Sequence, residues 1–117
     1  MRAVIMEAAG RPVMVVIPAH AHVDTQKVAA TLGVERAHIA GDDAYTQVFR
    51  DCEAGAIPPF GNLYGLPVYV DAGFLWVHTV VFPAGRRTRS VTMPYREYVR
   101  LVRPVVADLV MTSPTQG

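Results

Sequence analysis

One stretch decides the fold: Gly55-Ala-Ile-Pro-Pro-Phe-Gly-Asn-Leu-Tyr-Gly-Leu-Pro-Val-Tyr-Val-Asp71, which sets three glycines and three prolines ahead of a short β-branched and aromatic run. Glycine permits positive φ and close backbone approach, whereas proline fixes φ and removes a backbone donor. Flexible linkers lack apolar anchors such as Ile57, Phe60 and Leu63. The stretch therefore predicts a rigid, shaped loop followed by a strand, and such a loop is a good place to bind a small polar ligand.

Before this loop, the sequence predicts a β-hairpin followed by two helices. The hairpin joins strands over Ala3–Glu7 and Val13–Ile17. Asp24 is a good N-cap for a helix over Thr25–Leu32, and Gly33 follows that helix. A short strand over Ala37–Ala40 comes next. The second helix is expected to start at Gly41-Asp42-Asp43 and to turn Tyr45, Val48 and Phe49 inward.

After the loop, the sequence predicts three strands and a final helix. The strands are Val68–Val70, Val77–Phe82 and Arg89–Met93, with turns at Ala72–Trp76 and at Pro83-Ala-Gly-Arg-Arg87. Pro94 suits the first turn of a helix that directs Tyr98, Leu101 and Val102 inward and Arg96, Arg100 and Arg103 outward. Pro104 breaks or kinks this helix, and Val105–Met111 is expected to add a last helical turn or two.

These elements predict one compact α/β domain over residues 1–111, with a flexible polar tail over 112–117. The sheet is expected to be mixed, mostly antiparallel and curled toward a barrel with flanking helices. A chain of 117 residues with 51% hydrophobic content can bury a self-sufficient core. No apolar run approaches a membrane span. The single cysteine, Cys52, excludes an internal disulfide and makes a reducing cytoplasm the expected location.

The net charge of +1 hides an asymmetry along the chain. Residues 1–78 hold five basic and eight acidic side chains, whereas residues 79–117 hold six arginines against Glu97 and Asp108. A basic C-terminal third is compatible with binding a nucleic-acid backbone. It is also the composition of a solvated hairpin and helix face, and charge clusters are usually of this second kind.

Three features are candidates for chemistry. His20-x-His22-x-Asp24 has the spacing of a metal site, but Asp24 is better explained as a helix cap, so we expect a polar loop and no metal. Cys52 lies between Asp51 and Glu53, which disfavours a thiolate nucleophile, so a structural role is expected. Asp71 at the strand end could hold the loop through backbone N–H groups or contact a ligand amine. No serine nucleophile elbow, phosphate loop or dinucleotide fingerprint is present.

The segment Gly55–Asp71, with Val15-Val-Ile-Pro-Ala-His-Ala-His-Val-Asp24 and Phe82-Pro-Ala-Gly85, resembles the YbaK/prolyl-tRNA synthetase-associated editing domain family. The likeness runs from about residue 2 to about residue 109. Its strongest part is the family's G-x-x-x-P loop, here Gly55-Ala-Ile-Pro-Pro59, followed by Gly61 and the strand that ends at Asp71.

The resemblance implies trans-editing, in which the ester between a wrong amino acid and the terminal adenosine of a tRNA is hydrolysed without a cofactor. Small apolar amino acids are hard to discriminate by binding alone, which is why a second, hydrolytic site is needed. It implies a substrate pocket lined by Gly55, Ala56, Ile57, Pro58, Pro59, Gly61 and Asp71, in which water attacks with help from the substrate's ribose hydroxyl. With tRNA as the expected partner, the charge asymmetry makes the basic face that carries Arg86, Arg87, Arg89, Arg96 and Arg100 the expected contact with the acceptor stem.

The chain departs from the family pattern in two respects. Members carry further residues before the first strand, including a helix and a His/Thr-bearing segment that walls the pocket, so the chain resembles an N-terminally truncated member. Members also carry an essential lysine where this chain has Arg2, and arginine does not replace lysine conservatively. Arg2 is therefore the candidate catalytic residue. The alternative is a non-catalytic module that binds aminoacyl-adenosine or tRNA, with a homodimer or partner protein covering the truncated edge.

Overall fold

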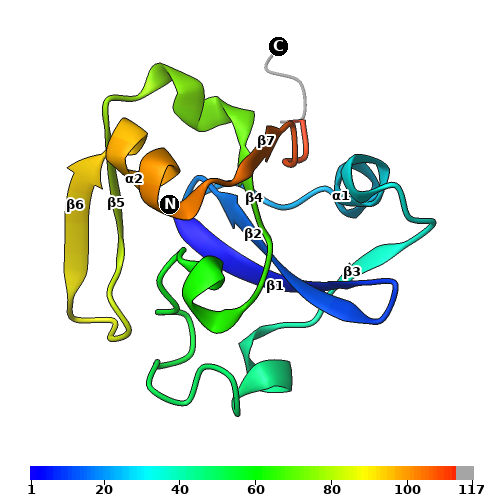
Figure 1. Cartoon of the computed structure of the whole chain (residues 1–117), viewed down its shortest axis with the longest axis horizontal. Helices are drawn as coiled ribbons and strands as arrows, with labels where there is room; N and C mark the ends of the chain where they lie inside the picture. Colours follow the sequence, from blue (N-terminus) through cyan, green and yellow to red (C-terminus); the bar gives the residue numbers. More distant parts are fainter. Residues whose placement is uncertain (113–117) are drawn as a thin grey trace.

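In the computed structural model, which describes residues 1–112 apart from the side chain of Asp42, the chain forms a five-stranded sheet and a separate two-stranded sheet (Figure 1). The strand order of the larger sheet is β3-β1-β2-β4-β7, and the smaller sheet pairs β5 with β6. The strands are β1 (Arg2–Ala8), β2 (Arg11–Ile17), β3 (Ala37–Ile39), β4 (Val68–Asp71), β5 (Thr79–Pro83), β6 (Ser90–Pro94) and β7 (Val105–Ala107). The helices are α1 (Thr25–Leu32) and α2 (Tyr95–Val102), with 3-10 turns η1 (Asp42–Tyr45), η2 (Gly61–Tyr64) and η3 (Ala72–Trp76).

The β1–β2 hairpin follows the sequence prediction closely. The two strands pair antiparallel from Arg2 opposite Ile17 to Ala8 opposite Arg11. The two turn residues, Ala9 and Gly10, have φ values of 53° and 76°. Positive φ at both central positions is the type I′ turn, whose twist matches that of the flanking strands.

Helix α1 also begins and ends where the sequence predicts. The side chain of Asp24 accepts hydrogen bonds from the backbone N–H groups of Gln26 and Lys27, at 3.0 and 3.1 Å. Gly33 takes a left-handed conformation with φ of 72° and closes the helix.

The larger sheet separates two hydrophobic clusters, because alternate residues of a strand face opposite sides. Val4, Met6 and their neighbours on β2 pack with Val28 of α1 on one side. Ala3 and Ile5 face the other side, where Phe49, Ile57, Phe82 and Tyr98 are gathered. Figure 1 shows the same division, with α1 on one side of the sheet and α2 with the β5–β6 hairpin on the other. The candidate loop belongs to this second, larger cluster.

The structure corrects the second predicted helix. Residues 42–45 form only the 3-10 turn η1, and turns follow to residue 51. Gly41 has φ of 78° and provides no side-chain cap, so the orphan N–H groups that start an α-helix lack an acceptor there. Phe49 is buried as predicted, but Val48 is 38% exposed.

The C-terminal end is corrected as well. Helix α2 forms and buries Tyr98 and Val102, yet Leu101 is 47% exposed. Arg103 adopts a left-handed conformation and Pro104 follows it, so the helix ends there. Val105–Met111 does not continue as helix. Its first three residues form β7, which pairs in parallel with β4.

The sheet is mixed, with β1–β2 and β1–β3 antiparallel and β2–β4 and β4–β7 parallel. It does not close into a barrel, because β3 and β7 occupy its two edges and do not pair with each other. Within residues 1–112, no helix is long and apolar enough to cross a membrane. The predicted tail lies, from residue 113 onward, outside the described residues.

Candidate functional site

The Gly55–Pro59 loop is held in place by hydrogen bonds to two other elements. The carbonyl oxygen of Ala56 accepts the backbone N–H of Gly85 at 2.9 Å, and Gly85 in turn accepts the N–H of Glu53 at 2.8 Å. At the other end, the hydroxyl of Tyr98 on α2 donates to the carbonyl of Pro59 at 2.7 Å. Ala56, Ile57 and Pro59 are buried, so the loop is a fixed part of the core.

Gly61 allows the loop to approach the sheet closely. A Cβ atom at this position would lie 2.9 Å from Val68 Cγ2 and 3.1 Å from Met14 Cβ. Just before it, Phe60 packs edge-on against the rings of Tyr98 and Phe82, each at a centroid distance of 5.4 Å. Gly61 therefore acts by packing in the region of the predicted pocket.

A cleft of about 320 Å³ opens beside this loop. It lies between the segment 43–54 and Ile57, and its lining residues are Asp43, Thr46, Phe49, Arg50, Cys52, Glu53, Ala54 and Ile57. The cleft combines an apolar floor with carboxylates, a guanidinium and a thiol. Of its residues, only Ile57 was predicted to bind substrate. The charged run Arg50-Asp-Cys-Glu53 directly before the loop is a sequence signal that could have found Arg50, Cys52 and Glu53.

Two hydrogen bonds fix polar groups at this cleft. Cys52 Sγ lies 3.5 Å from the hydroxyl of Tyr64, and this contact together with burial raises the pKa of Tyr64 to about 12. The Glu53 carboxylate accepts the backbone N–H of Arg87 at 2.7 Å. By contrast, Asp43 has no hydrogen-bond or ion-pair partner among the described residues.

Arg2 lies on the other face of the sheet from the loop. Its guanidinium donates to the carbonyl oxygen of Ala21 at 2.9 Å, and Ala21 packs against the cluster that contains Val4 and Met6. The chain's only lysine, Lys27, is on that same side, where its ammonium contacts the Asp108 carboxylate at 2.9 Å. The structure therefore does not bring Arg2 together with Gly55–Pro59.

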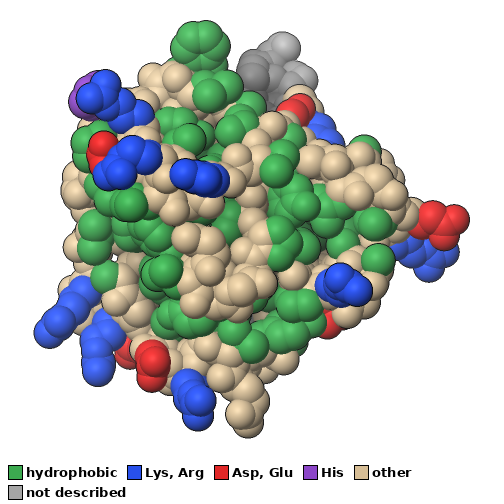
Figure 2. Space-filling view, viewed as in Figure 1, with side chains coloured by type: hydrophobic (Ala, Val, Ile, Leu, Met, Phe, Trp, Pro, Cys, Tyr) green, Lys and Arg blue, Asp and Glu red, His purple; other side chains and the backbone are tan. Residues whose placement is uncertain are grey.

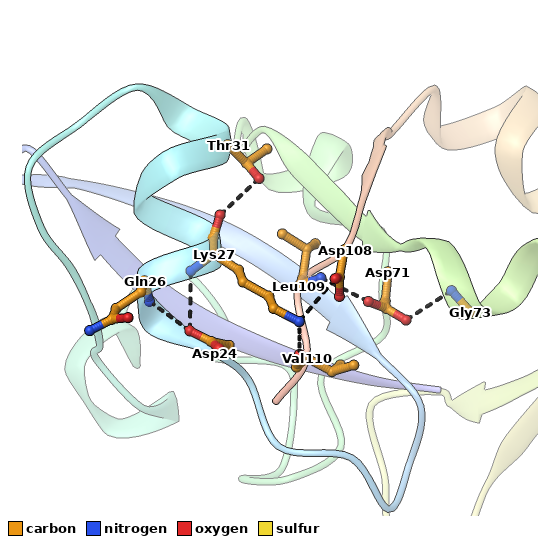
Figure 3. A network of polar contacts seen from close by, with 9 residues as sticks. All are labelled: Asp24, Gln26, Lys27, Thr31, Asp71, Gly73, Asp108, Leu109 and Val110. Atoms are coloured by element: carbon orange, nitrogen blue, oxygen red, sulfur yellow. Dashed lines mark hydrogen bonds and ion pairs between the residues drawn. The ribbon is translucent and has the colours of Figure 1, made fainter. Parts of the chain in front are cut away.

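Asp71 is buried and both of its carboxylate oxygens serve the fold (Figure 3). One oxygen accepts the N–H of Gly73 at 2.8 Å and caps η3. The other accepts the N–H of Leu109 at 2.9 Å, which ties the segment after β7 to the end of β4. Asp71 thus accepts backbone N–H groups, as one of its two expected roles required, but it holds η3 and the segment after β7 and not the Gly55–Pro59 loop.

The histidines of the His20-x-His22-x-Asp24 motif are both exposed, and Asp24 is occupied as the cap of α1. Over residues 1–112, no group of three or more His, Cys, Asp or Glu side chains is placed to hold a metal ion.

The five arginines predicted to bind tRNA are all exposed and fall into two groups. Arg86, Arg87 and Arg89 lie in the turn between β5 and β6, and Arg96 and Arg100 lie on α2. Figure 2 shows Lys and Arg side chains at both of these places along one side of the molecule. Arg100 is paired with Glu97 at 2.6 Å, which lowers the pKa of that carboxyl.

Two solved structures show the same fold at less than 25% sequence identity to this chain. A hypothetical protein, APE2540, matches with a TM-score of 0.83 and 22% identity over 94% of this chain and 73% of its own. A candidate trans-editing enzyme for prolyl-tRNA synthetase matches with a TM-score of 0.81 and 20% identity, over 95% of this chain and 69% of its own. No curated protein matches this chain.

The family model of the aminoacyl-tRNA editing domain matches residues 1–101, which is most of the chain. The matched region contains β1 through most of α2, together with the Gly55–Pro59 loop and the cleft beside it. Membership of this editing-domain family implies an interaction with tRNA. By its sequence match and its fold, this chain belongs to the aminoacyl-tRNA editing domain family.

Proposed function

We propose that this chain hydrolyses the ester bond that joins a mischarged small amino acid to tRNA, with the aminoacyl group held in the cleft beside Gly55–Pro59. The observation that carries the proposal is the cleft itself, which combines the family's loop with polar groups of both signs. Its volume of about 320 Å³ is at the small end of ligand pockets, which suits a small side chain.

The reaction requires a water oxygen to attack the ester carbonyl carbon, after which the bond to the ribose oxygen breaks and that oxygen leaves with a proton. In this proposal, the partner-free carboxylate of Asp43 accepts the proton of the attacking water, and the ribose hydroxyl of the substrate helps to position that water. The Arg50 guanidinium donates to the carbonyl oxygen as negative charge develops there. Ile57 contacts the amino-acid side chain.

A deacylation panel with several mischarged tRNAs tests this function. The wild-type chain is expected to release amino acid from at least one of them. We expect Asp43→Asn to slow release by about 10²- to 10⁴-fold and Arg50→Ala by about 10²- to 10³-fold. Arg36→Ala, which removes another exposed arginine, serves as the matched control and is expected to retain the wild-type rate. A folded wild-type protein that left every mischarged tRNA intact would refute the proposal.

One observation favours the alternative of a non-catalytic binding module. The family's lysine position is occupied by Arg2, whose guanidinium is engaged with Ala21 on the opposite face of the sheet. The two functions differ in a simple comparison. A binding module retains mischarged tRNA without hydrolysing it, whereas the enzyme releases the amino acid. If Arg2→Ala hydrolyses as fast as the wild type, Arg2 has no catalytic role.

A further inference from the structure

The proposed hydrolysis leaves one charged group of the cleft without a role. Glu53 lines the cleft, but neither the attack of water nor the stabilisation of the carbonyl oxygen involves it. Glu53 forms no ion pair with any residue that the structure describes. Its carboxylate accepts one hydrogen bond, from the backbone N–H of Arg87 at 2.7 Å. A carboxylate has two oxygens that can accept several donors, so this contact leaves acceptor capacity unused at the cleft.

Glu53 is fixed in place by its backbone as well as by its side chain. Its carbonyl oxygen accepts the N–H of Ala56 at 3.0 Å, and its own N–H donates to the carbonyl of Gly85 at 2.8 Å. The contact with Arg87 ties the carboxylate to the same β5–β6 turn. Ile57, which contacts the amino-acid side chain in the proposed function, is buried and directly follows Ala56. The carboxylate and this apolar wall of the cleft therefore belong to one hydrogen-bonded unit.

The substrate carries two groups that match this pair. The α-carbon of an esterified amino acid bears both a side chain and an ammonium group, so a cleft that holds the side chain must also accommodate a positive charge. An ammonium that leaves water without gaining an acceptor costs free energy. Asp43 is poorly suited to accept it, because an adjacent cation lowers the pKa of a carboxyl and makes it a weaker base. Glu53 is the other carboxylate that lines the cleft.

We propose that the Glu53 carboxylate binds the α-ammonium group of the aminoacyl ester, so that the cleft takes esters with a free amine in preference to neutral acyl esters. The inference rests on the proposed function, since it takes the ester substrate as the ligand. A hydrogen bond from an ammonium to a carboxylate is stronger than one between neutral groups. Esters whose amine is blocked by an acyl group lack this charge and should be poor substrates.

Two adenosine derivatives test the contact without any hydrolysis. One carries an alanyl group on a 3′-amide, and its lactyl counterpart has a hydroxyl in place of the amine at nearly the same size. The alanyl amine is protonated at about pH 6.5. Under these conditions we expect the wild-type chain to bind the alanyl derivative about 5- to 20-fold more tightly, as measured by titration calorimetry. Equal affinities, or no binding of either derivative, would overturn the proposal.

Variants assign the preference to one carboxylate. Glu53→Gln keeps an oxygen for the N–H of Arg87 and removes the negative charge, so it should bind the two derivatives about equally and the lactyl one as the wild type does. Asp51→Asn removes a neighbouring exposed carboxylate that does not line the cleft, and it should keep the wild-type preference. If Asp51→Asn loses the preference to the same extent, only general negative charge attracts the amine. If Asp43→Asn loses it and Glu53→Gln does not, the assignment to Glu53 is wrong.

Hydrolysis assays separate this inference from the proposed function. Alanyl-tRNA and lactyl-tRNA contain the same ester bond, and each rate is compared with its own uncatalysed rate. A wild-type chain that accelerates both equally is a hydrolase in which Glu53 does not bind the amine. A wild-type chain that cleaves neither, yet binds the alanyl derivative more tightly and loses this preference in Glu53→Gln, is a binding module in which the Glu53 contact is present.

Discussion

Asp71 illustrates how a residue that suits a ligand can instead be required by the fold. Its two oxygens accept N–H groups from Gly73 and Leu109, and the Leu109 contact is buried. We expect Asp71→Ala to lower the free energy of unfolding by about 2–4 kcal/mol, because it leaves a buried donor without an acceptor. Asp71→Asn keeps one acceptor and should lose less. Urea denaturation measures both, and an unchanged midpoint for Asp71→Ala would contradict the structural role.

Gly61, also predicted to line the pocket, serves the packing of the fold. Its φ is not positive, so the strain in Gly61→Ala would come from the 2.9 Å approach of the new Cβ to Val68. We expect this substitution to destabilise the protein by about 1–3 kcal/mol through overpacking. Gly10→Ala is a useful comparison, because Gly10 has φ of 76° and open space around it, so that only the backbone is strained. The two thermal unfolding midpoints separate the effects: with Val68→Ala as background, which removes the Cγ2 atom at 2.9 Å, the defect of Gly61→Ala should shrink and that of Gly10→Ala should not.

At the scale of elements, a cluster of side chains ties the wall of the cleft to the sheet. Glu7 on β1 accepts hydrogen bonds from Tyr45 of η1 and contacts His38 of β3 at 3.0 Å. The Tyr45 hydrogen bond is the largest cause that holds the pKa of Glu7 below its ordinary value, and it raises the pKa of Tyr45. Because η1 includes Asp43, which lines the cleft, this cluster positions part of the candidate site.

The cluster predicts a pH dependence of stability with a definite sign. A carboxyl whose pKa is lower in the folded than in the unfolded chain stabilises the fold above the unfolded value, and this contribution is lost as pH falls through the folded value. The difference in unfolding free energy between wild type and Glu7→Gln should therefore be present above the ordinary pKa of glutamate and shrink as the pH falls below about 4. Urea unfolding at a series of pH values measures it. A difference that grows below about pH 4 would contradict the assignment.

For the whole molecule, local signals in the sequence predicted more of the fold than long-range ones did. The hairpin, α1 with its caps, the β5–β6 turn and the start of α2 are confirmed, because each depends on residues close together in sequence. The prediction for Val105–Met111 was wrong, since β7 exists only through pairing with β4, more than thirty residues earlier. Such pairing has no signature in the segment itself, beyond its β-branched valines.

The candidate site was predictable to a similar extent. The Gly55–Pro59 loop was found because glycine and proline constrain the backbone directly. Arg2 faces away from the loop because side chains alternate along β1, and Ala3 and Ile5 are the residues of this strand that face the loop. The charged lining of the cleft depends on the irregular course of residues 43–54, and no periodic pattern marks such a segment.

The charge asymmetry of the whole chain leads to a prediction about tRNA affinity. Arg86, Arg87 and Arg89 are exposed in one turn, whereas Arg100 is neutralised in part by Glu97. Each phosphate contact that is lost lowers the slope of affinity against salt by nearly one unit. If the turn contacts the tRNA backbone, replacing its three arginines with alanine should reduce this slope by about two to three units, while Arg100→Ala changes it less.

The matched control for this experiment is the double variant Arg11→Ala and Arg36→Ala, which removes exposed positive charge outside the basic C-terminal third. Binding of uncharged tRNA across a salt series gives the slopes. If the control and the turn variant reduce the slope equally per arginine removed, only net charge attracts the tRNA and the β5–β6 turn is no specific contact. A loss confined to the turn variant would place the tRNA against the β5–β6 turn. This turn includes Gly85, whose backbone N–H is hydrogen-bonded to Ala56 of the Gly55–Pro59 loop.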